Sequence, residues 1–227
     1  MIEKEILDYR LDKLIFSQNM LSAWKRSKKE SIDKYIRHIF WSDDSQLDRD
    51  YEQNMSYGRD FHLMCQRIFL GIDPIRSTSD YDKDLDRVKK IYRLYKNRYG
   101  QDVIFLPEHR IELKDGIQAT YDLLVKVYEN GELIRLDIWD WKTERKKIEK
   151  NYAENKMQTR VYMYVCKESI GSDLDYENIR MYYYQPAIDR QVMVDYSEDR
   201  HAANRNIIYS IIGEIRNLKL EDLREEV

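Results

Sequence analysis

Cysteine is scarce in this chain. The 227 residues include two cysteines, Cys65 and Cys166, which lie far apart in the sequence. A zinc ribbon or a cysteine-ligated cluster needs closely spaced pairs of the Cys-x-x-Cys kind, so the sequence excludes both. Unpaired thiols are the usual state in a reducing compartment. We therefore predict a cytoplasmic protein with two free thiols and no iron–sulfur cluster.

Long apolar runs are also missing. No stretch approaches the ~20 consecutive apolar residues that a helix needs to cross a bilayer. Residues 1–16 carry charges throughout and lack the apolar centre of a signal peptide. These absences predict a soluble, intracellular protein with no membrane partner.

Neither sign of charge dominates. Lysine and arginine together number 39, aspartate and glutamate number 42, and the formal net charge is -3. This balance neither predicts nor excludes a nucleic-acid partner. A local basic stripe can hold phosphates while a metal site elsewhere concentrates carboxylates.

Glycine and proline are rare in the first hundred residues, which contain only Gly58, Gly71, Gly100 and Pro74. Apolar residues recur there at steps of three and four, which is typical of amphipathic helices. The pattern predicts four helices, over residues 17–24, 32–39, 47–70 and 82–99. Ser17 is positioned to cap the first of them.

The pattern changes after residue 100. Branched and aromatic residues predict strands over 103–113, 117–128, 133–143, 179–185 and 191–196. Helices are predicted over 149–168 and 198–218. We expect one domain over residues 1–227, with a mainly helical cap (1–100) and an α/β core (101–227) that is α/β or α+β in class.

The sharpest signal is Asp140-Trp141-Lys142 on the predicted strand 133–143. Positions two apart share a face of a strand, so Asp140 and Lys142 project together while Trp139 and Trp141 point the other way. An acid and a lysine on a sheet face are unfavourable unless they have a role. The alternative is an ordinary salt bridge on an exposed edge strand.

A second acid, Asp122, lies on the preceding predicted strand. A three-residue loop at 129–131, with glycine third, predicts a type I turn with a bulge. That loop pairs Tyr128 with Glu132 and sets Asp122 opposite Ile138, on the face of the Asp-x-Lys side chains. A two-residue loop would move Asp122 to the other face.

Two converging carboxylates can hold a hard divalent cation. Lys142 could then steady a water molecule or the phosphate that is cleaved, which is metal-assisted hydrolysis. Magnesium or manganese suits oxygen ligands, and an added imidazole favours manganese.

In these motifs the chain resembles the PD-(D/E)XK nucleases, specifically their RecB-like exonuclease branch. That branch has Gly-x-x-x-His on a helix, an acid, an aspartate, Asp/Glu-x-Lys and then Gln-x-x-x-Tyr on the following helix. The counterparts in chain order are Gly58 to His62, Glu108, Asp122, Asp140 to Lys142, and Gln158 to Tyr162. The resemblance implies a restriction-endonuclease-like core, with a mixed central sheet flanked by helices, and a metal-dependent DNA exonuclease.

The resemblance also implies roles for individual residues. His62, Asp122 and Asp140 would bind Mg²⁺ or Mn²⁺, helped by the backbone carbonyl of Trp141. Lys142 would be catalytic together with the two aspartates. For His62 alone, a histidine packed within its helix is the alternative.

The remaining matched residues would serve the cleft. Gln158 and Tyr162, four apart on one helix face, would line it and contact DNA or orient the lysine. Glu108 could belong to the acid set or could simply pair with a neighbouring base. The sequence leaves both interpretations of Glu108 open.

The chain departs from the branch at two positions. Ala119 stands where many relatives have glycine. Ser27 stands where the iron–sulfur members carry their first cysteine, and nothing after Cys166 could supply the rest, so no cluster is expected. No helicase motif accompanies the domain. A helicase, or a repair or defence partner, would have to be a separate chain.

A basic run follows the Asp-x-Lys motif and includes Arg145 and Lys146. Such runs are usually solvated loops, but at this location the side chains could equally track phosphates without reading sequence. Nearby, Tyr152, Tyr162 and Tyr164 could stack on the bases of a single strand, although packing in a helix core would explain at least some of them.

Two other functions compete with the exonuclease. One is a non-catalytic nucleic-acid-binding or assembly module on the same fold, although such a module would be expected to lose its lysine first. The other is a restriction-type endonuclease, which would need dimerisation and base-reading elements. The DNA substrate could be single-stranded or a duplex end.

Overall fold

The computed structural model describes residues 3–39, 46–73 and 82–223, with only the helical backbone described for 46–56. The α-helices are α1 (Lys4–Asp12), α2 (Gln18–Arg26), α3 (Lys28–Ser31), α4 (Gln46–Phe69), α5 (Asp82–Tyr99), α6 (Lys150–Asn155), α7 (Met157–Lys167) and α8 (Glu198–Arg216). The strands are β1 (Phe16–Ser17), β2 (Val103–Glu112), β3 (Ile117–Glu129), β4 (Glu132–Trp141), β5 (Ile179–Gln185) and β6 (Arg190–Val194). Short turns of helix are η1 (Ile32–Arg37), η2 (Tyr176–Asn178), η3 (Pro186–Ile188) and η4 (Leu220–Leu223).

Most predicted elements are present, with two differences in the helices. The helix predicted over 149–168 is two helices, α6 and α7, because Lys156 between them is extended with ψ 140°. The helix predicted over 32–39 is the π-helix η1, preceded by the single turn α3. The Ser17 cap is confirmed: its hydroxyl oxygen accepts a hydrogen bond from the N–H of Met20 at 3.3 Å.

The strands form one mixed sheet. Its order is β1-β3-β4-β5-β6, with β2 also paired to β3. β1–β3 and β4–β5 are parallel, while β2–β3, β3–β4 and β5–β6 are antiparallel. The Asp-x-Lys strand β4 therefore lies inside the sheet, between β3 and β5, and the edge-strand interpretation of that motif is wrong.

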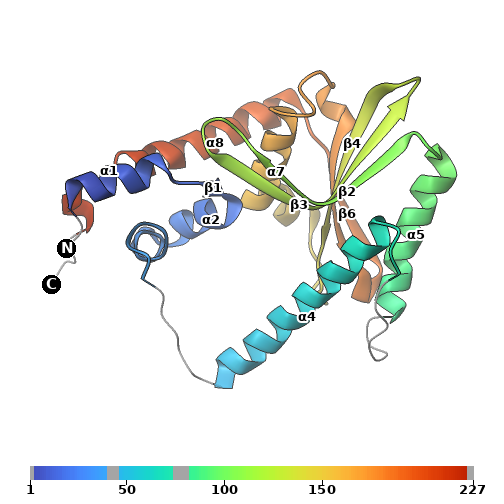
Figure 1. Ribbon diagram of the computed structural model, residues 1–227, viewed down its shortest axis with the longest axis horizontal. Helices are drawn as coiled ribbons and strands as arrows, with labels where there is room; N and C mark the ends of the chain where they lie inside the picture. Colours follow the sequence, from blue (N-terminus) through green and yellow to red (C-terminus); the bar gives the residue numbers. More distant parts are fainter. Residues whose placement is uncertain (1–2, 40–45, 74–81, 224–227) are drawn as a thin grey trace.

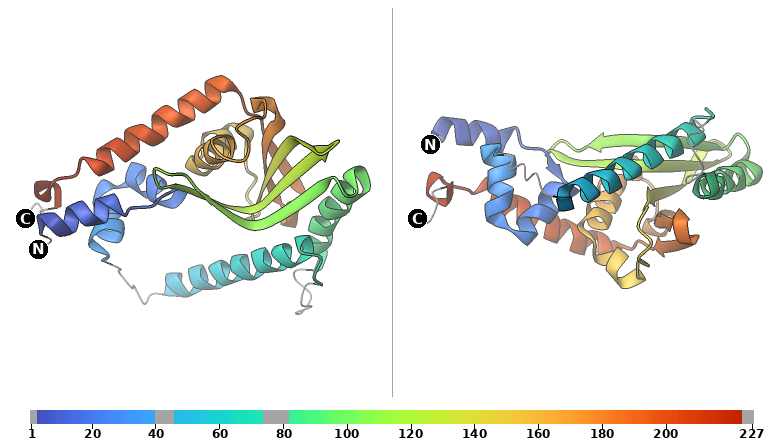
Figure 2. Two further views of the ribbon diagram at one scale, coloured as in Figure 1. Left: turned by 45° about the horizontal axis from the view of Figure 1, so that its top comes forward. Right: turned by 90° about the horizontal axis from the view of Figure 1, so that it is seen from below.

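Helices cover both faces of the sheet (Figures 1 and 2). One face is buried with α1, α2, α7 and α8, and the other with α4 and α5. Trp139 and Trp141 lie in the second cluster, where the Trp141 ring stacks on Phe69 with centroids 5.8 Å apart. Their predicted orientation, away from the Asp-x-Lys side chains, is confirmed. The buried thiols of Cys65 and Cys166 lie in different clusters.

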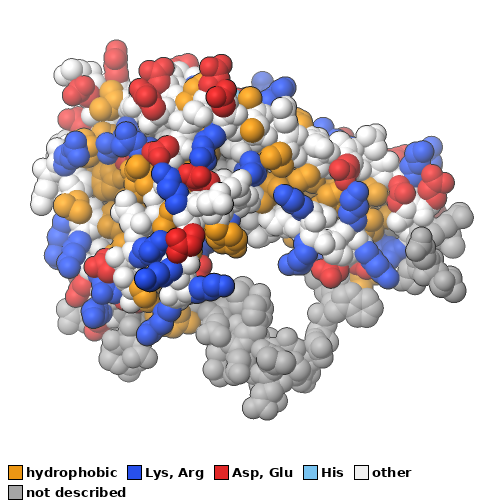
Figure 3. All heavy atoms as spheres, turned by 180° about the vertical axis from the view of Figure 1, so that it is seen from behind, with side chains coloured by type: hydrophobic (Ala, Val, Ile, Leu, Met, Phe, Trp, Pro, Cys, Tyr) orange, Lys and Arg blue, Asp and Glu red, His pale blue; other side chains and the backbone are white. Residues whose placement is uncertain are grey.

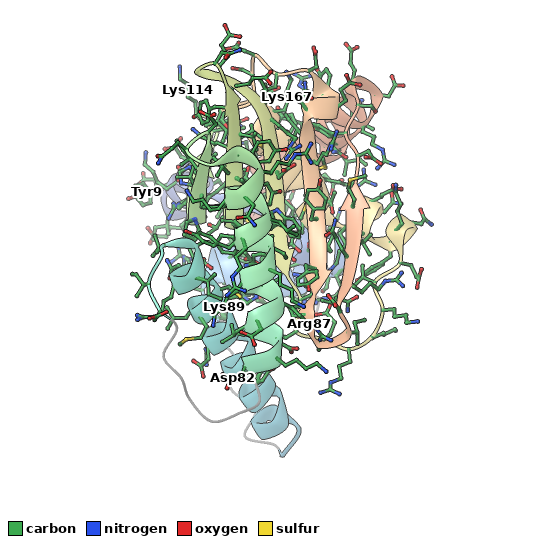
Figure 4. All side chains as sticks on the ribbon, turned by 90° about the vertical axis from the view of Figure 1, so that its right-hand side faces the viewer. Tyr9, Asp82, Arg87, Lys89, Lys114 and Lys167 are labelled. Carbon is green, nitrogen blue, oxygen red and sulfur yellow. The ribbon has the colours of Figure 1, made fainter. Side chains whose placement is uncertain are left out.

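Helix α5 lies along the sheet and is held to the β5–β6 connection (Figure 4). The guanidinium of Arg87 donates a hydrogen bond to the carbonyl of Pro186. Within the described ranges, no helix is both long and apolar enough to span a membrane. On the face in Figure 3, basic and acidic side chains are interspersed, as the small net charge would suggest.

The β3–β4 hairpin has a different turn from the one predicted. Glu129 pairs with Glu132, so the loop contains only Asn130 and Gly131. Both loop residues have positive φ, 53° and 85°, as a type I′ turn requires. The predicted three-residue loop is wrong.

A two-residue loop alone would place Asp122 on the opposite face from Asp140, and a β-bulge in β4 restores it to the same face. Tyr128 pairs with Leu133 but Val127 pairs with Arg135, so Ile134 is an extra residue. One extra residue shifts the register by one. The last paired residues, Leu123 and Trp139, therefore leave the next residues, Asp122 and Asp140, level with each other.

The site lies at a stretch of β3 where, among the residues that the structure describes, one edge of the strand has no partner strand. β2 occupies one edge of β3 over residues 118–127. The other edge is shared, because β4 pairs with residues 123–129 and β1 with 117–118. Asp122 lies in the interval between these two partners. Because α2 begins directly after β1, its first turn is brought to the same interval.

Candidate metal centre and catalytic site

Three carboxylates lie level with one another on neighbouring strands. Glu108 on β2 falls between the pairs Pro107–Leu123 and His109–Tyr121, which places it opposite Asp122 on β3. Asp140 on β4 is level with Asp122 on the other side. Glu108 has φ 49°, an unfavourable left-handed conformation for glutamate that costs on the order of 1–3 kcal/mol. No pattern in the sequence indicated this conformation.

An imidazole joins this row from α4. His62, Glu108 and Asp122 each present a ligand atom, and these atoms lie within 4.8 Å of one another. His62 Nδ1 is 3.4 Å from Asp122 Oδ1, and its Nε2 is within hydrogen-bonding distance of the Trp141 carbonyl, at 3.1 Å. Two carboxylates and one imidazole are a donor set that could hold a divalent cation. His62 is therefore not sealed in its helix.

Asp140 lies beside this group and has both carboxylate oxygens engaged. Its Oδ2 is 2.6 Å from the ammonium of Lys142, and its Oδ1 accepts a hydrogen bond from the amide of Gln158. Only 1% of Asp140 is exposed. The structure thus brings Glu108 into the closest ligand group with His62 and Asp122, while Asp140 holds Lys142.

Asp122 also closes the β3–β4 ladder. Its Oδ2 accepts the backbone N–H of Trp141 at 2.8 Å. The side chain therefore takes a donor that a strand carbonyl would otherwise satisfy. This bond fixes Asp122 next to Asp140 and toward His62.

The charges at the site are strongly coupled. Burial raises the pKa of Asp140 to about 6; Lys142 opposes the shift and Asp122 adds to it. Burial disfavours the charged form of His62, but Asp122 outweighs it and the pKa of His62 is raised. Burial likewise opposes the charge of Lys142, yet Asp140 and Asp122 raise its pKa. A bound cation would offset the negative charge of the neighbouring carboxylates Glu108, Asp122 and Asp140.

We expect the affinity for Mn²⁺ to fall as the pH falls, first as His62 takes up a proton, since its pKa is raised above the usual value, and further through about 6 as Asp140 does. Below that pH the buried Asp140 is neutral, since its pKa is raised to about 6, and more of His62 is protonated. A ligand must lose its proton to bind metal, so each such group costs about tenfold in affinity per pH unit. Calorimetric titration of Mn²⁺ between about pH 5 and about pH 8 measures the effect. If the affinity for Mn²⁺ did not change across that pH range, the assignment of these residues as ligands would be contradicted.

Cavities lie on both sides of the carboxylate row. One, of about 560 Å³, is lined by residues of α4 together with Glu108 and Thr143. The other, of about 470 Å³, is lined by the first turn of α2, Lys142 and the α6–α7 junction. The first cavity therefore reaches Glu108 and His62, and the second reaches Lys142 and Gln158, the two partners of Asp140. The sequence did not indicate that Thr143 lines a cavity. It did not indicate Lys156 either, because a continuous helix was expected where the structure has the α6–α7 junction.

Gln158 and Tyr162 have different positions relative to the cleft. Gln158 reaches Asp140, as described above, and lines the second cavity. Tyr162 is only 6% exposed, and its ring packs edge-on against Tyr121 at 5.0 Å. Burial raises the pKa of its hydroxyl, which the neighbouring amide of Gln158 partly opposes. Tyr162 is therefore packed behind Gln158 and lines neither cavity.

The basic loop after β4 is held in place by one buried side chain. Arg145 and Lys146 are exposed on it. Gln185, at the end of β5, donates hydrogen bonds to the carbonyls of Glu144 and Lys146 at 2.8 and 2.7 Å. It also accepts the N–H of Ile148 at 3.0 Å. The loop is thus tied to the sheet.

We expect Gln185→Ala to lower the free energy of unfolding by about 1–3 kcal/mol, the cost of leaving the buried N–H of Ile148 without a partner. Urea denaturation measures the change. Gln191→Ala is the matched control, because Gln191 is an exposed glutamine on the neighbouring strand β6. Equal stabilities for the two variants would contradict the role of Gln185.

The fold and the site together define a class: a restriction-endonuclease-like protein with an acid–lysine centre on a mixed sheet. The family model of the PD-(D/E)XK nuclease superfamily matches residues 81–225. The chain belongs to this superfamily, which confirms the predicted family and fold class. The matched range contains Glu108, Asp122, Asp140 and Lys142, whereas His62 lies before it.

Comparison with solved structures gives distant similarities. A candidate exonuclease from Eubacterium rectale is 11% identical, with a TM-score of 0.48 over 96% of this chain and 87% of its own. A protein called SSO0001 is also 11% identical, with a TM-score of 0.43 over 98% of this chain and 86% of its own. A search of curated proteins finds no significant match.

Proposed function

We propose that this protein is a divalent-metal-dependent deoxyribonuclease that acts as an exonuclease. One observation carries the proposal. His62, Glu108 and Asp122 present ligand atoms within 4.8 Å of one another, and beside them Lys142 is 2.6 Å from Asp140. These side chains come from α4, β2, β3 and β4. Convergence from four separate elements is not expected of incidental surface charges.

Each residue has a defined role in this proposal. Asp122 and Asp140 hold Mg²⁺ or Mn²⁺, with His62, Glu108 and the Trp141 carbonyl as further ligands. When bound, the ion supplies Lewis acidity at a phosphoryl oxygen.

Lys142 acts on the phosphate. It lies at the end of the carboxylate row and lines the second cavity. Its ammonium is positioned to stabilise the negative charge that develops on the phosphate as the phosphodiester bond is hydrolysed. Gln158 restrains Asp140 through its hydrogen bond, so that Lys142 keeps a constant orientation.

The proposal also covers the substrate and the mode of action. The preference for DNA and for cutting from an end follows from the motif order shared with the RecB-like branch. Arg145 and Lys146, exposed on the loop after β4, are placed to contact phosphates. Any helicase, repair or defence partner would be a separate chain, acting with this one in the cytoplasm.

The test is digestion of end-labelled single-stranded and duplex DNA with Mn²⁺, with Mg²⁺ or with a chelator. We expect metal-dependent shortening from an end, with no cleavage in chelator and none by Lys142→Ala. DNA binding without any cleavage would identify the non-catalytic module instead. Discrete internal fragments from the duplex would identify an endonuclease. Cleavage of RNA alone would overturn the DNA assignment.

A further inference from the structure

Lys156 occupies an unusual position next to the catalytic centre. It lies at the break between α6 and α7, with φ -60° and ψ 140°. Its ammonium is 5.2 Å from the ring of Tyr152 and 5.1 Å from the ring of Tyr183. In the part of the chain that the structure describes, it makes no ion pair.

Lys156 is coupled to the acid–lysine pair through Tyr183. Tyr183 on β5 is the register partner of Asp140, and the ammonium of Lys142 is 5.8 Å from the same ring. The charge of Lys142 is balanced by Asp140, but that of Lys156 is not. Burial and repulsion from Lys142 lower the pKa of Lys156, which Asp140 and Glu144 only partly offset. An anion bound there would remove this disadvantage.

The cavity in front of Lys156 has the composition of an anion site. It measures about 470 Å³, within the ~300–1,000 Å³ range of small-molecule sites. The described side chains that line it include two lysines, several amides and one serine, but no carboxylate. Gln18, Asn19 and Ser22 come from the first turns of α2, brought there by β1. The cavity thus offers several hydrogen-bond donors and no carboxylate among the described residues of its lining, and the adjacent carboxylate of Asp140 is already engaged by Lys142 and Gln158.

Tyr152 adds an aromatic surface at the rim of this cavity. Its side chain is 62% exposed, although the ring is large and apolar. Exposed aromatic rings beside a cation are the usual platform for the bases of single-stranded nucleic acid. Stacking needs a base with a free face, as in a single strand, because the adjacent pairs cover both faces of a base inside a duplex.

We propose that this cavity is a nucleotide subsite: Lys156 binds the phosphate adjacent to the one that is cleaved, and Tyr152 stacks on the unpaired base of that nucleotide. The subsite rests on the proposed function for the identity of the neighbouring phosphate. A subsite of this kind would select single-stranded DNA, or an unpaired end of a duplex, as the substrate.

Binding without cleavage tests the subsite. We would measure fluorescence anisotropy of a labelled single-stranded oligodeoxynucleotide, and of a blunt duplex of the same sequence, in chelator. Tyr152→Ala should weaken single-strand binding about 5- to 100-fold, the usual value of one stacked base, and leave duplex binding within about twofold. Tyr152→Phe should bind as wild type, because the ring is kept.

Lys156→Gln should weaken single-strand binding about tenfold and reduce the slope of log K against log salt by ~0.7, the value for one lost phosphate contact. Lys89→Gln, on α5, is the matched control and should leave the slope unchanged (Figure 4). Thermal melting of each variant shows whether it is folded.

The outcomes separate the subsite from the proposed function. Single-strand binding that is unchanged in folded Lys156→Gln and Tyr152→Ala overturns the subsite, as does equal loss on the duplex or no binding of DNA by the wild type. If both variants lose binding but the wild type never cleaves, the subsite stands and the nuclease proposal fails. If the wild type cleaves and the variants bind normally, only the subsite fails.

Discussion

Replacing Lys142 with alanine is expected to slow DNA hydrolysis at least about a hundredfold, the typical loss when one preorganised group that stabilises transition-state charge is removed. The ammonium does two things in the structure. It faces the cavity that would hold the phosphate, and it offsets the charge of Asp140 at 2.6 Å. Single-turnover rates with saturating Mn²⁺ measure the loss.

The same substitution should affect stability, which must be separated from catalysis. Asp140 is 1% exposed, and without Lys142 its pKa rises above about 6, since Lys142 opposes the effect of burial. Leaving a buried charge unpaired costs up to about 3–5 kcal/mol, limited here by protonation of Asp140. The double variant Asp140→Asn, Lys142→Ala should recover stability but remain inactive.

A control lysine lies on α5. Lys89, which is half-buried, forms an i,i+3 pair with the exposed Asp86 at 3.6 Å, and Figure 4 shows it on the helix that covers the opposite face from α7. Lys89→Ala should cleave DNA at the wild-type rate. Wild-type cleavage by purified Lys142→Ala would show that the acid–lysine centre does not catalyse the reaction.

Replacing Asp122 with asparagine is expected to reduce hydrolysis and Mn²⁺ affinity at least about a hundredfold each. Loss of a residue that only orients a ligand already costs about 10–100-fold, and Asp122 is central to the ligand group with His62 and Glu108. The fold should be retained. Asparagine keeps an oxygen that can accept the N–H of Trp141, which now bonds Asp122 at 2.8 Å.

A spectroscopic readout distinguishes this loss from a general structural effect. Asp122 raises the pKa of His62 by hydrogen bonding and charge, against the effect of burial. In Asp122→Asn the pKa of His62 should therefore fall, which NMR titration of the imidazole measures. Asp86→Asn, an exposed aspartate on α5, should change neither the pKa nor the activity. An unchanged His62 pKa in Asp122→Asn would contradict the arrangement.

Several features of the fold were predictable because they depend on local pattern. Apolar periodicity located α5, and runs of branched and aromatic residues located β2 to β6 within one or two residues of the observed bounds. The order of five short motifs indicated the superfamily, which the family match confirms. These signals are encoded in neighbouring residues, and the backbone responds to them locally.

Other features depend on contacts that no local pattern specifies. The loop length at 129–131 was predicted wrongly. The shorter loop would have moved Asp122 to the other face of the sheet, and the extra residue Ile134 shifted the register back. Lys156 was hidden inside an expected helix, since the break between α6 and α7 leaves no proline or glycine at that point. Tyr162 was expected at the cleft, but packing against Tyr121 buries it.

The sequence by itself determined the chemistry of this protein: which acids, which lysine and which imidazole are available, and in what order along the chain. Only the tertiary structure decided which of them meet. Glu108 joined His62 and Asp122, while Asp140 was engaged by Lys142 and Gln158. The physical reason is that burial of both sheet faces sets the strand register and the docking of the helices. That burial depends on contacts between residues that are distant in the chain.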